Sequence, residues 1–305
     1  MSAKNIAATL GAVYPSGGWW RCRCPVHNSN GPTLALRDGD RGLVVKCHAG
    51  CARGEVLEEL HRRGLVEHGA GQPADPEAIQ REREAQERDR SRRLATAVDL
   101  WCYETRPAVR SVVETYLRSR RITLPPPPTL RCSASMLRHR ESGERRPAMV
   151  ALVEHVERGP VGVHATYLAM DGSMKATIEP AKRSLGPVGG GAVRLAPAAE
   201  ELMIAEGIET ALAGMQATGL PAWAALSTSG LVALLLPPLV RDVIILADHD
   251  RNHAGERAAR IAAERWLAEG RRVRIAMPPE PDTDFADLLV GRGITRELGV
   301  SHVAG

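Results

Sequence analysis

The stretch ELMIAEGIETALAGMQATGLPAWAALS, residues 201–227, decides the fold of the C-terminal part of the chain. Its first apolar run ends at a Glu-Gly pair, and a helix-like segment then leads into a second apolar run. The same alternation continues through DVIILADHD at 242–250, ERAARIAAERWLAEG at 256–270 and RRVRIAMPP at 271–279. Apolar strands that alternate with amphipathic helices predict an α/β domain, with a mostly parallel sheet covered on both faces.

Acidic residues stand at the ends of these predicted strands. Glu206 follows the first strand, Asp248 and Asp250 follow the third, and Asp284 and Asp287 enter the last predicted helix. We expect the carboxylates to gather at the edge where parallel strands end, and crowded carboxylates need a hard cation such as Mg²⁺ or Mn²⁺. The pattern predicts a site for nucleotidyl or phosphoryl transfer, with the first three residues as catalytic metal ligands. The last two would add a second metal or tune the first.

These positions resemble the Toprim domain, whose signature is a glutamate after the first strand and an Asp-x-Asp after the third. Gly255 matches the small residue that follows this second motif in the family. The resemblance covers residues from about 200 to 290. Toprim domains also occur in topoisomerases, old-family nucleases and recombination factors, so the resemblance does not by itself fix the reaction.

Four of the six cysteines lie in one short segment near the N-terminus. A Cys-Pro-Val-His turn at 24–27 and a Cys-His-Ala-Gly-Cys turn at 47–51 carry ligands that suit tetrahedral zinc, and the chain shows no export signal that would favour disulfides. A small antiparallel ribbon cannot bury a core of its own, so we expect the metal to hold it together. The predicted zinc ligands are Cys24, His27, Cys47 and Cys51. Cys22 and His48 are alternatives, because either could replace a neighbour.

The segment CPVHNSNGPTLALRDGDRGLVVKCHAGC, residues 24–51, resembles the CHC2-type zinc-binding domain of phage and bacterial primases. It departs from the commonest bacterial form by having three residues rather than two between its last cysteines, as phage and plasmid versions do. A zinc module followed by a Toprim domain is the order found in primases. The resemblance therefore implies a DNA primase, a nucleotidyltransferase that makes short RNA primers on single-stranded DNA in phage or plasmid replication.

The sequence predicts four regions. A zinc-ribbon domain at 1–70 ends in a helix at 55–66, and a charged helical linker region follows at 71–128 and closes with four prolines. A small β-rich subdomain of the catalytic core occupies 129–198, with strands at 148–156 and 161–170. The Toprim domain fills 199–305.

A basic loop precedes the predicted Toprim domain. The stretch KATIEPAKRSLGPVGGGAVRL, residues 175–195, surrounds three successive glycines with cations that suit nucleoside triphosphates or a template backbone. Because the net charge is only +4, contact with nucleic acid has to come from such a local patch. The predicted nucleotide-binding and DNA-binding residues are Lys175, Lys182, Arg183 and Arg194, of which Lys182 and Arg183 would hold phosphates.

Two other functions compete with primer synthesis. A Toprim nuclease would use the same metals to activate water, and a replication adaptor would bind DNA or a helicase through the zinc ribbon without catalysis. A topoisomerase is disfavoured, because none of the four tyrosines has a strand-passage domain around it. The chain has no GxxxxGK[ST] motif, so we expect a replicative helicase to act in trans. No apolar run reaches the roughly 18 residues of a membrane span, which predicts a cytoplasmic protein with no membrane contact.

Overall fold

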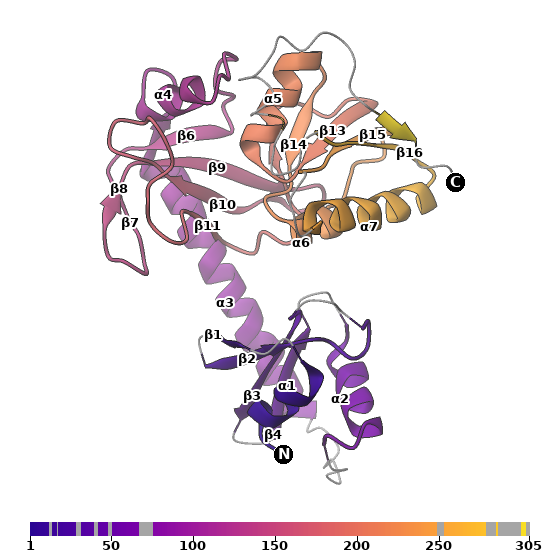
Figure 1. Ribbon diagram of the computed structural model, residues 1–305. Helices are drawn as coiled ribbons and strands as arrows, with labels where there is room; N and C mark the ends of the chain where they lie inside the picture. Colours follow the sequence, from indigo (N-terminus) through magenta and orange to yellow (C-terminus); the bar gives the residue numbers. More distant parts are fainter. Residues whose placement is uncertain are drawn as a thin grey trace. The chain divides into compact units, whose positions relative to one another are not determined.

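The chain divides into two compact units, residues 1–82 and 83–305 (Figure 1). The computed structural model describes residues 1–11, 14–16, 18–28, 32–39, 42–47, 51–66, 76–248, 253–278, 285 and 300–302.

The N-terminal unit is a four-stranded antiparallel sheet accompanied by two helices. Its strands lie in chain order and are β1 (Tyr14–Ser16), β2 (Trp19–Cys22), β3 (Leu34–Gly39) and β4 (Gly42–Cys47). The helices are α1 (Ala3–Leu10) and α2 (Arg53–Arg62). Strands β2 to β4 and helix α2 confirm the expected ribbon and its closing helix. The expectation that the ribbon lacks a core is wrong, because these elements bury a continuous cluster that includes Ile6, Leu34, Leu36, Val56 and Leu60.

Helix α1 supplies one side of that cluster, and the sequence analysis missed it. Ser2 caps its N-terminus through a side chain that accepts a hydrogen bond from the Asn5 amide, and Gly11 ends it at a φ of 80°. Ala3, Ile6 and Ala7 are buried at the spacing of one helical face. A Ser cap, this spacing and the closing glycine are helix signals that were present in the sequence.

The C-terminal unit contains an antiparallel sheet and the end of the charged helix α3 (Pro76–Tyr103). None of the described helices, α3 included, is both long and apolar enough to cross a membrane. The sheet has the order β11-β10-β9-β6-β5. Its strands are β5 (Thr105–Pro107), β6 (Leu130–Ser133), β9 (Ala148–His155), β10 (Gly159–Tyr167) and β11 (Lys182–Leu185), and a separate hairpin pairs β7 (Leu137–Arg138) with β8 (Arg145–Arg146).

The segment after α3 differs from the expected charged helical linker region at 71–128. It contains β5, which pairs with β6, and helix α4 (Val112–Ser119), whose Tyr116 and Leu117 are buried. Ser111 caps α4 by accepting a hydrogen bond from the Val113 amide. Residues 104–119 are therefore part of the folded unit, because their apolar side chains complete its core.

A six-stranded, mostly parallel sheet forms the rest of the C-terminal unit, as the sequence predicted. Its order is β12-β14-β13-β15-β16-β17, with four parallel inner strands and antiparallel edges. The strands are β12 (Val193–Arg194), β13 (Glu201–Ala205), β14 (Ala222–Ala224), β15 (Asp242–Leu246), β16 (Arg272–Ala276) and β17 (Val300–His302). Helix α5 (Ile208–Thr218) covers one face, and α6 (Thr228–Ala233) and α7 (Ala254–Ala268) cover the other (Figure 1).

The two sheets of the C-terminal unit share one hydrophobic core. A single cluster joins Leu130 and Met149 of the antiparallel sheet to Met203 and Leu212 of the six-stranded sheet and its helix α5. A second cluster, around Trp223 and Trp266, lies under α6 and α7. The shared cluster fixes the edge of the antiparallel sheet beside the carboxyl end of β13.

We predict that the turn from β14 into α6 does not tolerate a side chain at Gly230. A Cβ atom there would overlap the carbonyl oxygen of Ala225. Gly230→Ala should lower the free energy of unfolding of the C-terminal unit by about 1–3 kcal/mol, the usual cost of overpacking. Urea unfolding followed by tryptophan fluorescence measures this change. Gly189→Ala is the matched control, because a Cβ at Gly189 meets nothing within 4 Å. Equal stability of the two variants would contradict the packing described here.

Candidate active site and metal centre

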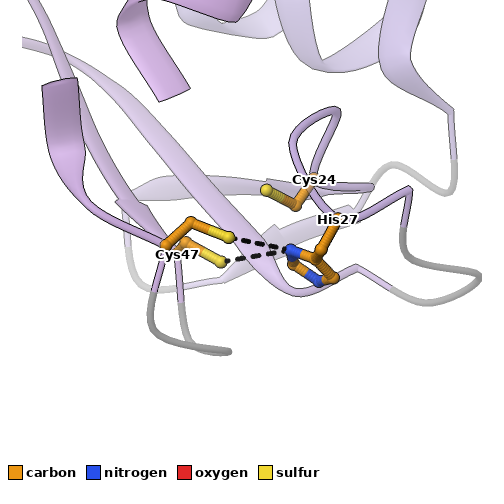
Figure 2. A group of neighbouring side chains, drawn as sticks. Cys24, His27 and Cys47 are labelled. Atoms are coloured by element: carbon orange, nitrogen blue, oxygen red, sulfur yellow. Dashed lines mark hydrogen bonds between the residues drawn. The ribbon is translucent and has the colours of Figure 1, made fainter. Parts of the chain in front are cut away.

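A cluster of four metal-binding side chains lies in the N-terminal unit. The ligand atoms of Cys24, His27, Cys47 and Cys51 all lie within 4.8 Å of one another. Figure 2 shows the imidazole of His27 facing the cysteine sulfurs, and its Nδ1 lies 3.8 Å from the Cys47 Sγ and 3.1 Å from the Cys51 Sγ. Zinc bonds of about 2.0–2.3 Å place tetrahedral ligands roughly 3.5–3.8 Å apart. The four side chains therefore fit a zinc ion, and they are the four that the sequence predicted.

The thiols of this cluster favour a bound cation. Burial and the neighbouring thiols of Cys47 and Cys24 together raise the pKa of Cys51 to about 12. Burial likewise raises the pKa of Cys24. Thiolates held this close repel one another, and a divalent cation offsets that repulsion because it binds the ionised form.

Thr33 orients the histidine, and the sequence analysis did not identify it. Its Oγ1 lies 3.1 Å from the Nε2 of His27, on the side of the ring away from the sulfurs. When Nδ1 binds metal, Nε2 carries the proton and donates a hydrogen bond to such a hydroxyl. This hydrogen bond fixes the tautomer and the orientation of the ring. Thr33 lies six residues after His27, and no spacing rule for metal ligands marked it.

The two alternative zinc ligands have different outcomes. Cys22 ends β2 and is fully buried in the core of the unit, where burial raises the pKa of its thiol to about 12. It is not a member of the cluster found among the described residues. His48 lies outside the described residues.

A second site lies at the carboxyl edge of the six-stranded sheet. Strands β13 and β15 pair in parallel, with Ala205 opposite Leu246, so Glu206 and Asp248 leave the sheet at the same edge. The Thr210 hydroxyl donates a hydrogen bond of 3.4 Å to the Asp248 carboxylate and links the first turn of α5 to it. The structure thus brings together two of the predicted carboxylates. Asp250, Asp284 and Asp287 lie outside the described residues.

The small residue expected after the Asp-x-Asp motif has a packing role. A Cβ atom at Gly255 would lie 3.0 Å from the carbonyl oxygen of Asp248. Gly255 is the second residue of α7, so the start of this helix packs directly on the backbone of Asp248. A larger residue would displace either the helix or the carboxylate.

A narrow cleft beside Glu206 lies where the two sheets of the C-terminal unit meet. Its volume is about 10 Å³, which is room for one water-sized group. In the antiparallel sheet, Thr166 pairs with Lys182 and His164 pairs with Ser184, so these four side chains share a face. The cleft is lined by His164, Thr166, Lys182, Glu206, Gly207, Ile208, Glu209 and Leu226.

Only part of the predicted basic loop reaches this edge. Lys182 lines the cleft, and the Lys175 Nζ lies 3.0 Å from Oε1 of Glu209. Arg183 follows Lys182 in the same strand and points to the opposite face, where its Nη1 lies 3.4 Å from the Glu141 carboxylate. The guanidinium of Arg194 stacks on the Trp223 ring at 4.7 Å.

The glycines of the same loop pack against the sheet. A Cβ atom at Gly190 would lie 3.3 Å from the His155 ring, and one at Gly191 would lie 3.0 Å from the Glu154 carbonyl oxygen. The close approach of loop and strand requires these glycines. They do not form an open cradle for phosphate.

Two buried groups of the cleft escaped the sequence analysis. Burial by itself would raise the pKa of Glu209, but the charges of Lys182 and Lys175 and a hydrogen bond from Tyr116 outweigh it and lower the pKa to about 2. Burial, together with the charge of Lys182, lowers the pKa of His164 to about 4, so this imidazole is neutral near pH 7. The sequence shows Glu209 only as an acidic residue in the first turn of a helix, where acids are common.

A larger open hollow of about 390 Å³ lies at the amino end of the same parallel strands. Its lining residues are Glu200, Arg241, Gly270 and Arg272. Arg272 is paired there with Asp242, the first residue of β15. Open α/β sheets place their chemistry at the opposite, carboxyl end, so the smaller cleft beside Glu206 is the candidate active site.

The two halves of the C-terminal unit match two different protein families. Residues 201–295 match the family model of the Toprim domain. They form a Toprim domain. Glu206 and Asp248, which were predicted to belong to its two acidic motifs, lie within the matched residues. Residues 91–195, which precede the Toprim domain, match a domain family of unknown function, DUF7146.

Solved structures of primase domains resemble the chain at low sequence identity. The zinc-binding and RNA polymerase domains of the Aquifex aeolicus primase are 15% identical, with a TM-score of 0.47 over 96% of this chain and 80% of that one. The RNA polymerase domain of the Mycobacterium tuberculosis primase is 16% identical, with a TM-score of 0.43 over 67% and 80%. The primase fragment of the bacteriophage T7 primase-helicase is 15% identical, with a TM-score of 0.38 over 58% and 65%. The search of curated proteins found no match.

We predict about one zinc ion per chain, bound by the four clustered side chains. Cys24→Ser should abolish the bound zinc, because it removes one of four ligands from a closed site. Cys22→Ala is the matched control, since it removes a buried cysteine two residues away that is not part of the cluster. Elemental analysis after gentle purification measures both. Zinc retained by Cys24→Ser, or lost from Cys22→Ala while the protein stays folded, would contradict the ligand set.

Proposed function

We propose that this chain is a DNA primase that makes short RNA primers on single-stranded DNA by Mg²⁺-dependent nucleotidyl transfer, in phage or plasmid replication. The proposal rests on the side chains at the carboxyl edge of the six-stranded sheet in the Toprim domain. There, Glu206 and Asp248 share one end of the sheet, and the antiparallel sheet brings Lys182 to the cleft beside them. Carboxylates for a metal beside cations for phosphate are what nucleotidyl transfer requires.

The carboxylate edge fits a hard divalent cation, since its donors are carboxylate oxygens. Glu206, Asp248 and Asp250 would hold Mg²⁺ or Mn²⁺, and Asp284 and Asp287 would add a second metal or tune the first. The bound metal would neutralise charge on the reacting phosphate.

The side chains of the antiparallel sheet would bind the nucleoside triphosphate. Lys182 is exposed, so its ammonium is accessible to phosphate oxygens at the mouth of the cleft. His164 is neutral near pH 7 and therefore adds no positive charge beside it. The cleft holds only one water-sized group, so the base and sugar of a nucleotide would lie outside it.

The zinc-binding unit would contact the template. Its sheet presents the Arg37 guanidinium over the Trp19 ring at 4.8 Å, and the Lys4 ammonium lies 5.4 Å from the Trp20 ring centre. Aromatic rings beside cations are typical of surfaces that bind single-stranded nucleic acid. A replicative helicase in trans would supply the opened template, because the sequence carries no motif for a nucleotide-driven motor.

A nuclease would use the same carboxylates to activate water, and an adaptor would need no catalysis. The cations at the cleft favour binding of a highly charged triphosphate over either alternative. A zinc-binding unit with an aromatic and cationic surface adds a second contact for a template strand.

We predict that the carboxylate edge is needed for chemistry and not for folding. Glu206→Gln and Asp248→Asn remove charge while nearly preserving shape, so primer synthesis should fall by about 100-fold or more. Binding of single-stranded DNA and the melting temperature should change little. Labelled primers separated on a gel measure synthesis.

Asp242→Asn is the matched control for these variants, because Asp242 begins the strand that leads to Asp248. It pairs with Arg272 at the far end of the sheet, and such exposed pairs contribute little to stability. This variant should make primers at close to the parental rate. Primer synthesis by Asp248→Asn at the parental rate would instead contradict the catalytic role of this carboxylate.

A further inference from the structure

We propose that Glu209 is a positioning residue that holds Lys175 and Lys182 at the carboxylate edge, where they bind the triphosphate of the incoming nucleotide. The role given to the lysines rests on the proposed function. The juxtaposition itself does not, because it is a property of the folded C-terminal unit.

Glu209 lies where a carboxylate needs a compensating charge. Its side chain is 5% exposed, and every residue of α5 from Ile208 to Gly214 is buried. An ionised carboxylate removed from water is costly unless cations or hydrogen-bond donors surround it. The identity of its neighbours is therefore what permits Glu209 to carry a charge at this position.

Those neighbours come from a different sheet. Lys175 precedes β11 and places its Nζ 3.0 Å from Glu209 Oε1, while Lys182 begins β11 and lines the same cleft as Glu209. Only four of the 40 basic residues in the chain are lysines, of which one contacts this carboxylate and a second lines the same cleft. Glu209 thus ties the cationic part of the antiparallel sheet to the Toprim domain.

Tyr116 fixes the direction of the carboxylate. Its buried hydroxyl donates a hydrogen bond of 2.6 Å to the same Oε1 that contacts Lys175. Tyr116 belongs to α4 and Lys175 to the segment before β11, and both contact the Oε1 atom of Glu209 in α5. Such a donor restricts rotation of the carboxylate and keeps it aimed at the lysine.

The arrangement has a consequence for phosphate binding. The ammonium groups of Lys175 and Lys182 repel each other, and the nearby Glu209 carboxylate offsets this repulsion. Lys175 is 37% exposed at its side chain, so it is held by Glu209 while part of its surface faces solvent. Removal of the carboxylate charge should therefore release Lys175 and weaken triphosphate binding, with a smaller effect on the chemical step.

The first test measures Lys175 directly and needs no enzymatic activity. The full chain is treated with a low concentration of acetic anhydride, and acetylation of each lysine is followed by mass spectrometry. In Glu209→Gln, Lys175 should be acetylated about tenfold faster than in the parent, because the amine has lost its ionic partner. Lys4 and Lys46, in the N-terminal unit, are internal references and should not change. An unchanged Lys175 rate in a folded variant would overturn the proposal.

Two further variants separate charge from shape. Tyr116→Phe removes the hydrogen bond that aims the carboxylate but leaves its charge, so Lys175 should be acetylated faster than in the parent and more slowly than in Glu209→Gln. If Glu209→Gln does not fold, Glu209→Asp replaces it, since Asp keeps the charge but withdraws the carboxylate by one methylene. Lys175 should then still react several-fold faster, and an unchanged rate would contradict the role of Glu209.

The second test is kinetic and depends on primer synthesis. For Glu209→Gln, the KM for ATP should rise about tenfold while kcat falls less than threefold, the pattern of lost substrate binding. Combined with Lys175→Gln, it should raise KM little beyond the larger single effect, because both act through one contact. Fully multiplicative effects would overturn the pairing. If the parent makes no primers, the proposed function fails, and the acetylation result still decides the role of Glu209.

Discussion

Negative charge is concentrated at the carboxyl edge of the six-stranded sheet, and the C-terminal unit is built to balance it. Parallel pairing of β13 with β15 brings Glu206 and Asp248 to that edge, and Glu209 adds a buried charge three residues later. The fold meets this constraint from outside the Toprim domain, with Lys175 and Lys182. The hydrophobic cluster shared by the two sheets is what keeps the lysines in place.

The N-terminal unit shows the same constraint with softer ligands. Three cysteines and a histidine meet at the tips of a small sheet, where their thiolates would repel without a cation. The unit also has its own hydrophobic core, built from α1, α2 and the sheet. Metal and core therefore stabilise the unit together. The metal links the four ligand side chains, and the core packs the helices against the sheet.

The sequence was sufficient for the parts of the fold that depend on local patterns. Alternating apolar strands and amphipathic helices predicted the parallel sheet, and the spacing of Cys24, His27, Cys47 and Cys51 predicted the metal cluster. Strand ends located Glu206 and Asp248, because the topology of a parallel sheet places them together. These features repeat with the period of a strand or a helix, or follow a fixed ligand spacing.

The parts that the sequence did not reveal depend on contacts between distant segments. Lys182 and Arg183 are adjacent in the sequence, and only the register of β11 decides which of them faces the cleft. The pairing of Lys175 with Glu209 joins the segment before β11 to helix α5, so no local pattern encodes it. Tyr116 lay in the region expected to be a charged helical linker, although its hydroxyl reaches Glu209 across 93 positions of sequence.

The most direct measurement of the central claim is one incubation of the parental chain with labelled nucleoside triphosphates, Mg²⁺ and end-labelled single-stranded DNA. A gel resolves both the new RNA and the fate of the DNA. The proposed function predicts short RNA products that require template, Mg²⁺ and triphosphates together, with the DNA left intact. Shortened DNA with no RNA product would contradict it and would identify the carboxylate edge as that of a nuclease.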